Sequence, residues 1–399
     1  SPVPVPHCRM KLIRSSEGLL GVAKYRCQHV RGFAKMKQPE SVISMGKRGG
    51  KVPAAAWLEQ GLTRTATPKG KLTTGIHKLN MDNWLLYDPE EAKDILKLKG
   101  EMLSDVETRP SVYQCAEDSP APQLEVLEMI CSYLPKRFPE SFEEANGVIT
   151  ALSTGERLDV KQWRAKVEEQ QSASSERALE AVSRLVQEDF VLLKDHTFHA
   201  GCVVSSFGRL RERFNLDLRE IHSKVHGYES DLHNPVTRFF NGLTPDKPCW
   251  RTNWAFTWHP SLKPHPERYP HRNAYAAGSK DRDSAEYMMR KMEEKGVGDA
   301  IWLKVEYQTF RRLEKNPDCV LFSIRTFVDP LTTLETMPEA AKLRLASRYD
   351  IIYTLYCVQF IVLQYLQWLE QITVKAGLPD HLSVSSLFPL PPPPPENLP

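Results

Sequence analysis

The sequence predicts an α+β fold built on an antiparallel β-sheet. Two long runs in the C-terminal half alternate apolar and polar residues with a period of two, and the short turn 314–318 joins them. Three shorter strand-like runs precede them, and helical patterns follow the second of these runs. Strands that follow one another without regular βαβ alternation favour an antiparallel sheet. The predicted strands are 189–194, 198–206, 253–258, 302–313 and 319–328.

The helical segments have their own signals. The segment 89–103 begins with a proline and two glutamates, which are favoured in the first turn of a helix. The segment 121–134 places Leu124, Leu127 and Ile130 on one apolar stripe. Three further segments are predicted to be mainly helical: 158–188, 216–228 and 234–243.

The two long strands carry charged and amide side chains between large aromatic residues. In the first strand, Glu306 and Gln308 share a face with Phe310. In the second, Phe322 shares one face with its even-numbered neighbours, and Arg325 lies on the opposite face. Two interpretations are open: a solvated face of an ordinary antiparallel pair, or one wall of a polar-lined pocket.

The chain divides into five regions. Residues 1–75 are basic, lack periodicity and are predicted to be disordered. Residues 76–187 form a helical N-terminal part, and residues 188–345 form the core with the sheet. Residues 346–386 contain an apolar helix. Residues 387–399 are proline-rich and are predicted to be extended, either as a plain tail or as a ligand for a proline-binding module.

Composition indicates a soluble globular protein in a reducing compartment, and we expect a cytoplasmic location. The 399 residues are 41% hydrophobic and 26% charged, and the net charge of +3 gives no electrostatic case for nucleic-acid binding. The eight cysteines are widely spaced and form no CxxC motif. Residues 351–372 are largely apolar, so this segment could be either a packed helix or a membrane span. A helix that packs on the protein or on a partner is favoured over a membrane span, since three glutamines interrupt it.

Several common catalytic motifs are absent from the sequence. There is no GxGxxG after a strand, no GxxxxGK[ST], no GxSxG and no HExxH. An internal nucleotide-binding fold is therefore not expected. Any electrons for redox chemistry would come from another protein.

Two polar clusters are candidates for a cofactor site. His222 and His226 are four residues apart in a predicted helix, where imidazoles serve as haem or zinc ligands or lie on a solvated helix end. Zinc would need further ligands. Arg251 and Asn253 stand between Trp250 and Trp254. This arginine either stacks on an indole or holds a carboxylate or bound oxygen of a cofactor.

Several blocks, in the same order, resemble the haem-dependent oxidative N-demethylase α-subunit-like family. The family patterns R-L-x-x-E-D-F-x-L-L, I-H-x-P-V-P-G-Y, R-x-N-W, V-E-R-Q-T-L-R-R-L and L-F-x-I-R-T-Y-V-x-P-L are similar to residues 184–193, 221–228, 251–254, 305–313 and 321–331. The resemblance covers about residues 77–345. The last two blocks, which stand in tandem, are highly specific.

The resemblance implies a haem b protein whose PAS-like domain has a five-stranded antiparallel sheet. Bacterial members of the family oxidise dimethylamine with O2. They take electrons from NADPH through a separate reductase with flavin and an iron–sulfur cluster, and a folate-binding partner receives the one-carbon product. Matched block by block, His222 would be the proximal iron ligand. Arg251, Asn253 and Trp254 would lie near the haem edge. The distal pocket would be lined or braced by Glu306, Gln308, Arg311, Arg312 and Arg325.

The sequence departs from the family pattern after His222. The two prolines of that block are Lys224 and His226 here, so a stiff turn is lost and a second imidazole is added. Two kinds of function remain open. One is a haem-dependent monooxygenase that acts on a small methylated amine with O2 and releases formaldehyde. The other is a non-catalytic haem- or gas-binding PAS-like sensor, or a relative that has lost haem.

Overall fold

The computed structural model describes residues 74–169, 178–205, 210–223, 225, 228–262, 290–336, 368, 371 and 372. The proline-rich end, His226 and almost all of the predicted disordered tail and of the apolar segment 351–372 lie outside these residues. Within the described ranges, no helix has both the length and the apolar character needed to cross a bilayer.

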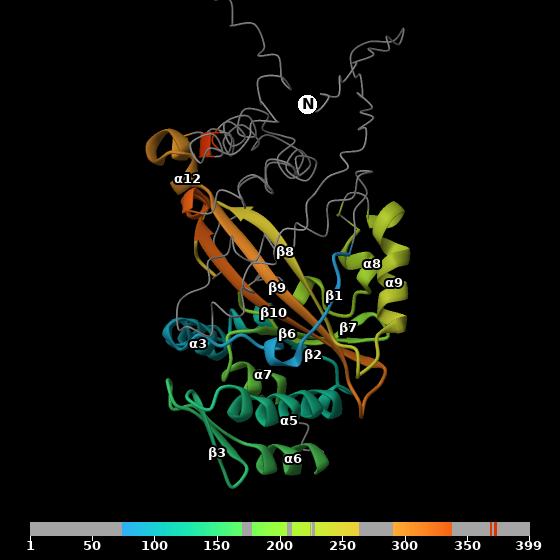
Figure 1. The fold of residues 1–399 in the computed structure, drawn as a ribbon. Coiled ribbons are helices and arrows are strands. Elements are labelled where there is room, and N and C mark those ends of the chain that lie inside the picture. Colours follow the sequence, from blue (N-terminus) through green and yellow to red (C-terminus); the bar gives the residue numbers. More distant parts are fainter. Residues whose placement is uncertain are drawn as a thin grey trace, which may run out of the picture.

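A seven-stranded antiparallel sheet organises the fold (Figure 1). Its strand order is β1-β8-β9-β10-β6-β7-β2. The strands are β1 His77–Lys78, β2 Tyr113–Cys115, β6 Asp189–Lys194, β7 Thr197–Cys202, β8 Cys249–Thr257, β9 Trp302–Arg312 and β10 Cys319–Pro330. The five predicted strands are confirmed and are contiguous in the sheet. The predicted number of strands is corrected, because the short strands β1 and β2 extend the two edges.

The hairpin of β9 and β10 has the predicted alternation. Glu306 pairs with Thr326, and Gln308 pairs with Ile324, so these residues share one face. Tyr307 pairs with Arg325 on the other face. Strand β8 continues the pattern, because Arg251 lies opposite Gln308 and Asn253 lies opposite Glu306.

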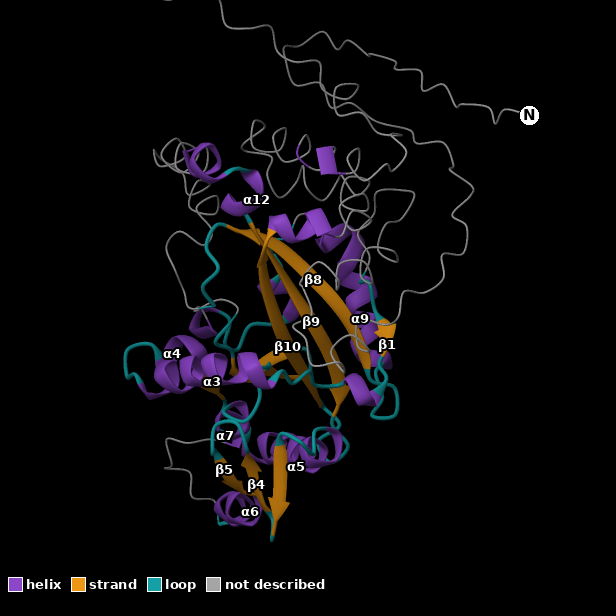
Figure 2. Cartoon of the chain, turned by 60° about the vertical axis from the view of Figure 1, so that its left-hand side comes forward, coloured by secondary structure: helices purple, strands orange, loops and turns teal. Residues whose placement is uncertain are grey.

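One face of the sheet is covered by helices (Figures 1 and 2). These include α3 Pro89–Ser104, α5 Pro120–Arg137 and α7 Ala178–Ser183, and α6 Val160–Glu168 packs on α5. The stripe of α5 buries Leu127 and Ile130 against the sheet core, as its spacing predicts. Asp88 caps α3 by accepting hydrogen bonds from the N–H groups of Glu90 and Glu91. We refer to this side as the helical face.

The region 142–159 forms strands before α6 begins, and no strand was predicted there. A second sheet contains β3 Phe142–Ala145, β4 Val148–Ala151 and β5 Arg157–Asp159. Asn146 and Gly147 turn the first pair with φ angles of 57° and 87°. This is the backbone that a two-residue hairpin requires. The predicted helix 158–188 is therefore split into β5, α6 and α7.

The other face of the sheet carries shorter elements and a second core cluster. These are η2 Leu210–Glu212, α8 Leu218–Ile221, η3 Tyr228–Leu232 and α9 His233–Gly242. Phe240 of α9 packs with Leu193, Phe310 and Val320 of the strands. The predicted helix 216–228 is wrong in extent, because α8 ends at Ile221. We refer to this side as the cavity face.

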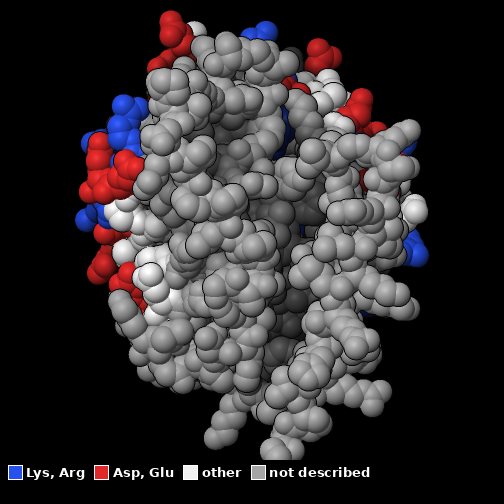
Figure 3. All heavy atoms as spheres, turned by 90° about the horizontal axis from the view of Figure 1, so that it is seen from above, with Lys and Arg blue, Asp and Glu red and all other residues white. Residues whose placement is uncertain are grey.

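The remaining elements are short: η1 Met81–Asn83, α4 Arg109–Val112, α12 Val297–Ala300 and η5 Leu331–Thr336. On the face seen in Figure 3, the described Lys and Arg side chains lie among Asp and Glu side chains. The described cysteines are free thiols, and Cys131, Cys202 and Cys319 are buried.

Candidate functional site

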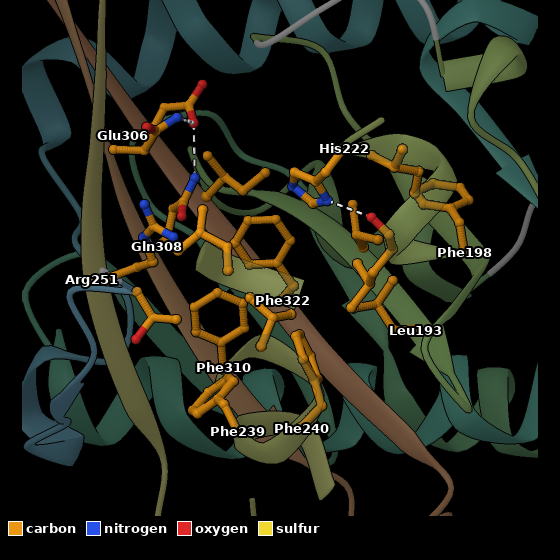
Figure 4. Close-up of a pocket in the computed structure, with 18 of the residues that line it drawn as sticks. Leu193, Phe198, His222, Phe239, Phe240, Arg251, Glu306, Gln308, Phe310 and Phe322 are labelled. Atoms are coloured by element: carbon orange, nitrogen blue, oxygen red, sulfur yellow. Dashed lines mark hydrogen bonds between the residues drawn. The ribbon is translucent and has the colours of Figure 1, made fainter. Parts of the chain in front are cut away.

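A cavity of about 410 Å³ lies between the sheet and the elements of the cavity face (Figure 4). This size is within the range of small-molecule sites, about 300–1,000 Å³. Most of its wall is apolar. Phe310 and Phe322 form a parallel stack with ring centroids 4.8 Å apart, and Phe239 meets Phe310 edge to face at 5.4 Å. A flat hydrophobic ligand would find aromatic and aliphatic contacts along this wall.

His222 is at the C-terminal end of α8 and lines the cavity. Its Nδ1 lies 2.6 Å from the carbonyl oxygen of Leu218. Because a carbonyl oxygen only accepts, Nδ1 carries the proton and Nε2 keeps its lone pair. The ring also stacks on Tyr228 with an interplanar angle of 9°. The imidazole is therefore held in one orientation and one tautomer.

The electrostatic surroundings keep this imidazole neutral. Burial lowers the pKa of His222, and the nearby guanidinium groups of Arg213 and Arg251 lower it further, although the bond to the Leu218 carbonyl acts in the opposite direction. A neutral imidazole is the form that binds a metal ion. The prediction of a helix with His222 inside it is wrong, since this residue caps the helix end.

Two guanidinium groups line the same cavity. Arg213 and Arg251 both reach it, and the Nε atom of Arg251 is buried without a hydrogen-bond partner among the described residues. Burial lowers the pKa of Arg251, and the Glu306 carboxylate partly offsets this effect. Arg213 had no signal in the sequence, because its surroundings show no pattern that separates it from a surface arginine.

Glu306 is the centre of a buried polar network at one end of the cavity. Its Oε1 lies 2.6 Å from Lys304 Nζ. Its Oε2 accepts hydrogen bonds from Asn253 Nδ2 at 3.2 Å and from Gln308 Nε2 at 2.9 Å. Burial alone would raise the pKa of Glu306, but Lys304 and these two amides more than offset burial and lower it. The carboxyl group is therefore ionised.

Four residues predicted for the site lie elsewhere. Trp254 points to the helical face, because it pairs with Val305 and packs against the core there. Arg311 lies on the same face, with its guanidinium 4.2 Å from the Trp84 ring. Arg325 also lies there, and it forms an ion pair with Glu91 at 2.8 Å.

Arg312 is at the end of β9 and does not line the cavity. It donates hydrogen bonds to the backbone carbonyls of Leu243 at 2.6 Å, Phe240 at 2.5 Å and Pro317. It thus ties α9 to the hairpin and braces the cavity wall. Trp254 was expected near the haem edge, and Arg311 and Arg325 were expected to line or brace the pocket. None of the three lines the cavity, because residues at odd positions of β9 and β10, and at even positions of β8, face away from it.

The cavity has the donor set that a haem needs. Haem presents a broad apolar ring, an iron that takes an axial imidazole, and two carboxylates. The aromatic wall matches the ring, and His222 matches the iron. Arg213 and Arg251 match the two carboxylates. The buried, unpaired Nε of Arg251 is a donor that such a carboxylate would satisfy. Among the described residues, no cluster of three or more His, Cys, Asp or Glu side chains could hold a metal ion.

These features define a protein with a cofactor cavity on one face of an antiparallel sheet. Residues 75–349 match the family described as haem-dependent oxidative N-demethylase, alpha subunit-like. This match covers more than half of the chain, and the protein belongs to this family. No match was found among curated proteins. The family description indicates haem dependence and a general oxidative demethylase-like role, and the words "alpha subunit" imply a partner subunit.

Proposed function

We propose that this protein is a haem-dependent monooxygenase that removes a methyl group from a small amine. The observation that carries the proposal is His222, whose Nδ1 is tied to a backbone carbonyl at the wall of a largely apolar cavity. Family membership supports the oxidative demethylase-like part of the proposal. The order of the five central strands, β8-β9-β10-β6-β7, supports a PAS-like arrangement.

Residues of this chain would hold haem b in three ways. His222 would supply the axial nitrogen, the aromatic wall would cover the ring, and Arg213 and Arg251 would bind the two carboxylates. A bound haem supplies the one-electron and O2 chemistry that no side chain provides. The apolar wall would exclude water from the reacting groups, which strengthens every electrostatic interaction there.

The overall reaction needs O2 and an outside reductant. A methylated amine, O2, two electrons and two protons give the demethylated amine, formaldehyde and water. One oxygen atom goes to the methyl carbon and the other leaves as water. We propose that the electrons come from NADPH through a separate flavin and iron–sulfur reductase, which is the partner that the family description leaves unnamed.

A second function, haem-based gas sensing, is favoured by one observation. The carboxylate of Glu306 is already bonded to Lys304, Asn253 and Gln308. It is therefore not a free counter-ion for a cationic amine, and a sensor needs no such group. Formaldehyde release from dimethylamine distinguishes the enzyme from the sensor.

The first experiment is an absorption spectrum of the purified protein during titration with haem. We compare the parent with His222→Ala and with His226→Ala, which tests the neighbouring imidazole. We expect a Soret band whose position and intensity change in His222→Ala and not in His226→Ala. Haem-loaded parent is then given dimethylamine, O2 and a chemical or enzymatic reductant, and formaldehyde is measured. A parent without a Soret band would overturn the proposal.

A further inference from the structure

Three groups of the protein already contact the carboxylate of Glu306. Lys304 lies against Oε1, and two amide groups donate to Oε2. Glu306 is 4% exposed and Lys304 is 2% exposed, so both charged groups of the pair are buried. Asn253 and Gln308 line the cavity together with Glu306, so a ligand at this end meets the two amides as well as the carboxylate.

The ionised carboxylate determines which way the two amides face. An ionised carboxylate only accepts hydrogen bonds, so Asn253 and Gln308 must turn their NH2 groups toward it. In a planar amide, the carbonyl oxygen then points away from the carboxylate. Both side chains line the cavity, and Figure 4 shows Gln308 bonded to Glu306 at its polar end. This end presents two carbonyl oxygens, which are acceptors without charge.

Different parts of the cavity wall suit two different kinds of ligand group. Arg213 and Arg251 are donors and suit carboxylates, whereas the carbonyl oxygens of Asn253 and Gln308 suit a group that donates N–H bonds. If haem carboxylates bind the guanidinium groups, as proposed above, the amide oxygens remain for the substrate. Lys304 offsets the charge of Glu306, and the amide oxygens beside this pair attract a ligand by hydrogen bonding.

We propose that Lys304 and Glu306 are positioning residues that hold Asn253 and Gln308 as a pair of carbonyl acceptors for the N–H group of the substrate. This inference rests on the proposed function and adds a rule of specificity. The site selects an amine by its N–H hydrogens. Secondary and primary methylammonium ions satisfy that rule, and a quaternary ammonium ion of the same charge does not.

The test is isothermal titration calorimetry on the haem-loaded protein with dimethylammonium and tetramethylammonium chloride. We expect dimethylammonium to bind at least about tenfold more tightly, since a site built to hydrogen-bond an N–H group rejects an analogue without one. In Lys304→Met we expect this preference to fall about tenfold, because Glu306 loses its ammonium partner and the amides are no longer held. Lys304→Arg keeps the cation and should restore part of the preference.

Lys99→Met is the matched control. Lys99 is also buried and pairs with a carboxylate, Asp189, at 3.5 Å, but it lies in α3 on the helical face. We expect it to leave the preference unchanged. If Lys304→Met does not fold, Gln308→Leu removes one carbonyl oxygen at similar size and should reduce the preference in the same way.

Three outcomes would overturn the inference: equal affinity for both ions, binding of neither ion to haem-loaded protein, or an unchanged preference in both Lys304→Met and Gln308→Leu. Each of these leaves the haem proposal intact if the Soret band of the parent depends on His222. A parent that takes up no haem overturns the proposed function itself. The two failures are therefore distinguishable.

Discussion

The two faces of the central sheet use buried charges in different ways. On the helical face, Lys99 donates to the carbonyl oxygens of Val186 and Glu188 and pairs with Asp189, and every contact ties one structural element to another. On the cavity face, Lys304 pairs with Glu306, and Glu306 also accepts hydrogen bonds from two amides at a cavity wall. The first pair joins a helix to the sheet, whereas the second keeps side chains in a fixed orientation beside open space.

This difference follows from the period of two in the strands. Tyr307 lies between Glu306 and Gln308 in the sequence, and Arg325 pairs with Tyr307 across the hairpin. Both side chains lie on the helical face. Tyr307 donates to the carbonyl of Asn83 at 2.8 Å, and Arg325 binds Glu91. The type of a residue therefore does not show whether it belongs to the site. The face of the sheet on which it lies must also be known.

The largest expected effect compares the two buried lysines. Lys99→Met leaves Asp189 buried without its ammonium, and we expect a loss of about 3–5 kcal/mol in the free energy of unfolding. Lys304→Met should cost less, about 1–3 kcal/mol, because water in the adjacent cavity can solvate Glu306. Urea unfolding of both variants and the parent, without haem, measures this. Equal losses would contradict the distinction between the faces.

A second comparison uses neighbouring residues of β10. Leu321 is fully buried on the helical face, and Leu321→Ala should lower the free energy of unfolding by about 2–5 kcal/mol without changing haem affinity per folded molecule. Phe322 is partly exposed at the cavity wall and stacks on Phe310. Phe322→Ala should cost less than Leu321→Ala and should weaken haem retention.

The measurements for this pair are thermal unfolding without haem and transfer of haem to a competing haem-binding protein. Phe322→Leu is the control that keeps an apolar side chain at the wall, and it should lie between Phe322→Ala and the parent in haem retention. If Leu321→Ala loses haem faster than Phe322→Ala, the division of the sheet into a packing face and a ligand face is wrong.

Sequence alone predicted the parts of the fold with a clear period. The hairpin of β9 and β10, the strand pair β6 and β7, and α5 follow from alternation or from an apolar stripe. The turn at Asn146 and Gly147 carried a strong hairpin signal that the prediction did not use, so β3 and β4 were missed.

The site was only partly predictable, for a physical reason. Alternation separated Glu306 and Gln308 from the odd-numbered residues of β9, and Arg325 from the even-numbered residues of β10. It could not say how the faces of the two strands match or which face borders the cavity. That depends on α8, α9, η2 and η3, which are brought together only by the tertiary fold. Arg213 directly follows η2 and has no local pattern, and Tyr228 is the first residue of η3. Lys304 shares the period of Glu306, and its role could have been inferred from that.

The smallest expected effect concerns two buried glutamates, one near each face, whose pKa values move in opposite directions. Burial raises the pKa of Glu188, and this effect exceeds the opposite influence of Arg325 and of the backbone N–H of Leu86. The pKa of Glu306 is lowered, because Lys304 and two amides outweigh burial. Glu188 therefore stabilises the fold most when protonated, and Glu306 stabilises it most when ionised.

The test is the pH dependence of stability in Glu188→Gln and Glu306→Gln, measured by urea unfolding from about pH 3.5 to 7.5. An unfolded glutamate titrates near pH ~4.3. Below that pH, Glu188→Gln and the parent should be similar in stability. As the pH rises, Glu188 ionises more readily in the unfolded parent than in the folded parent, so the parent loses stability relative to the variant.

For Glu306→Gln the sign reverses. The parent should be the more stable at neutral pH, and its advantage should shrink as pH falls through the lowered pKa of Glu306. Difference curves with the same slope for both variants would contradict the contrast between the two carboxylates. Opposite slopes would show that the fold favours the neutral form of Glu188 and the charged form of Glu306.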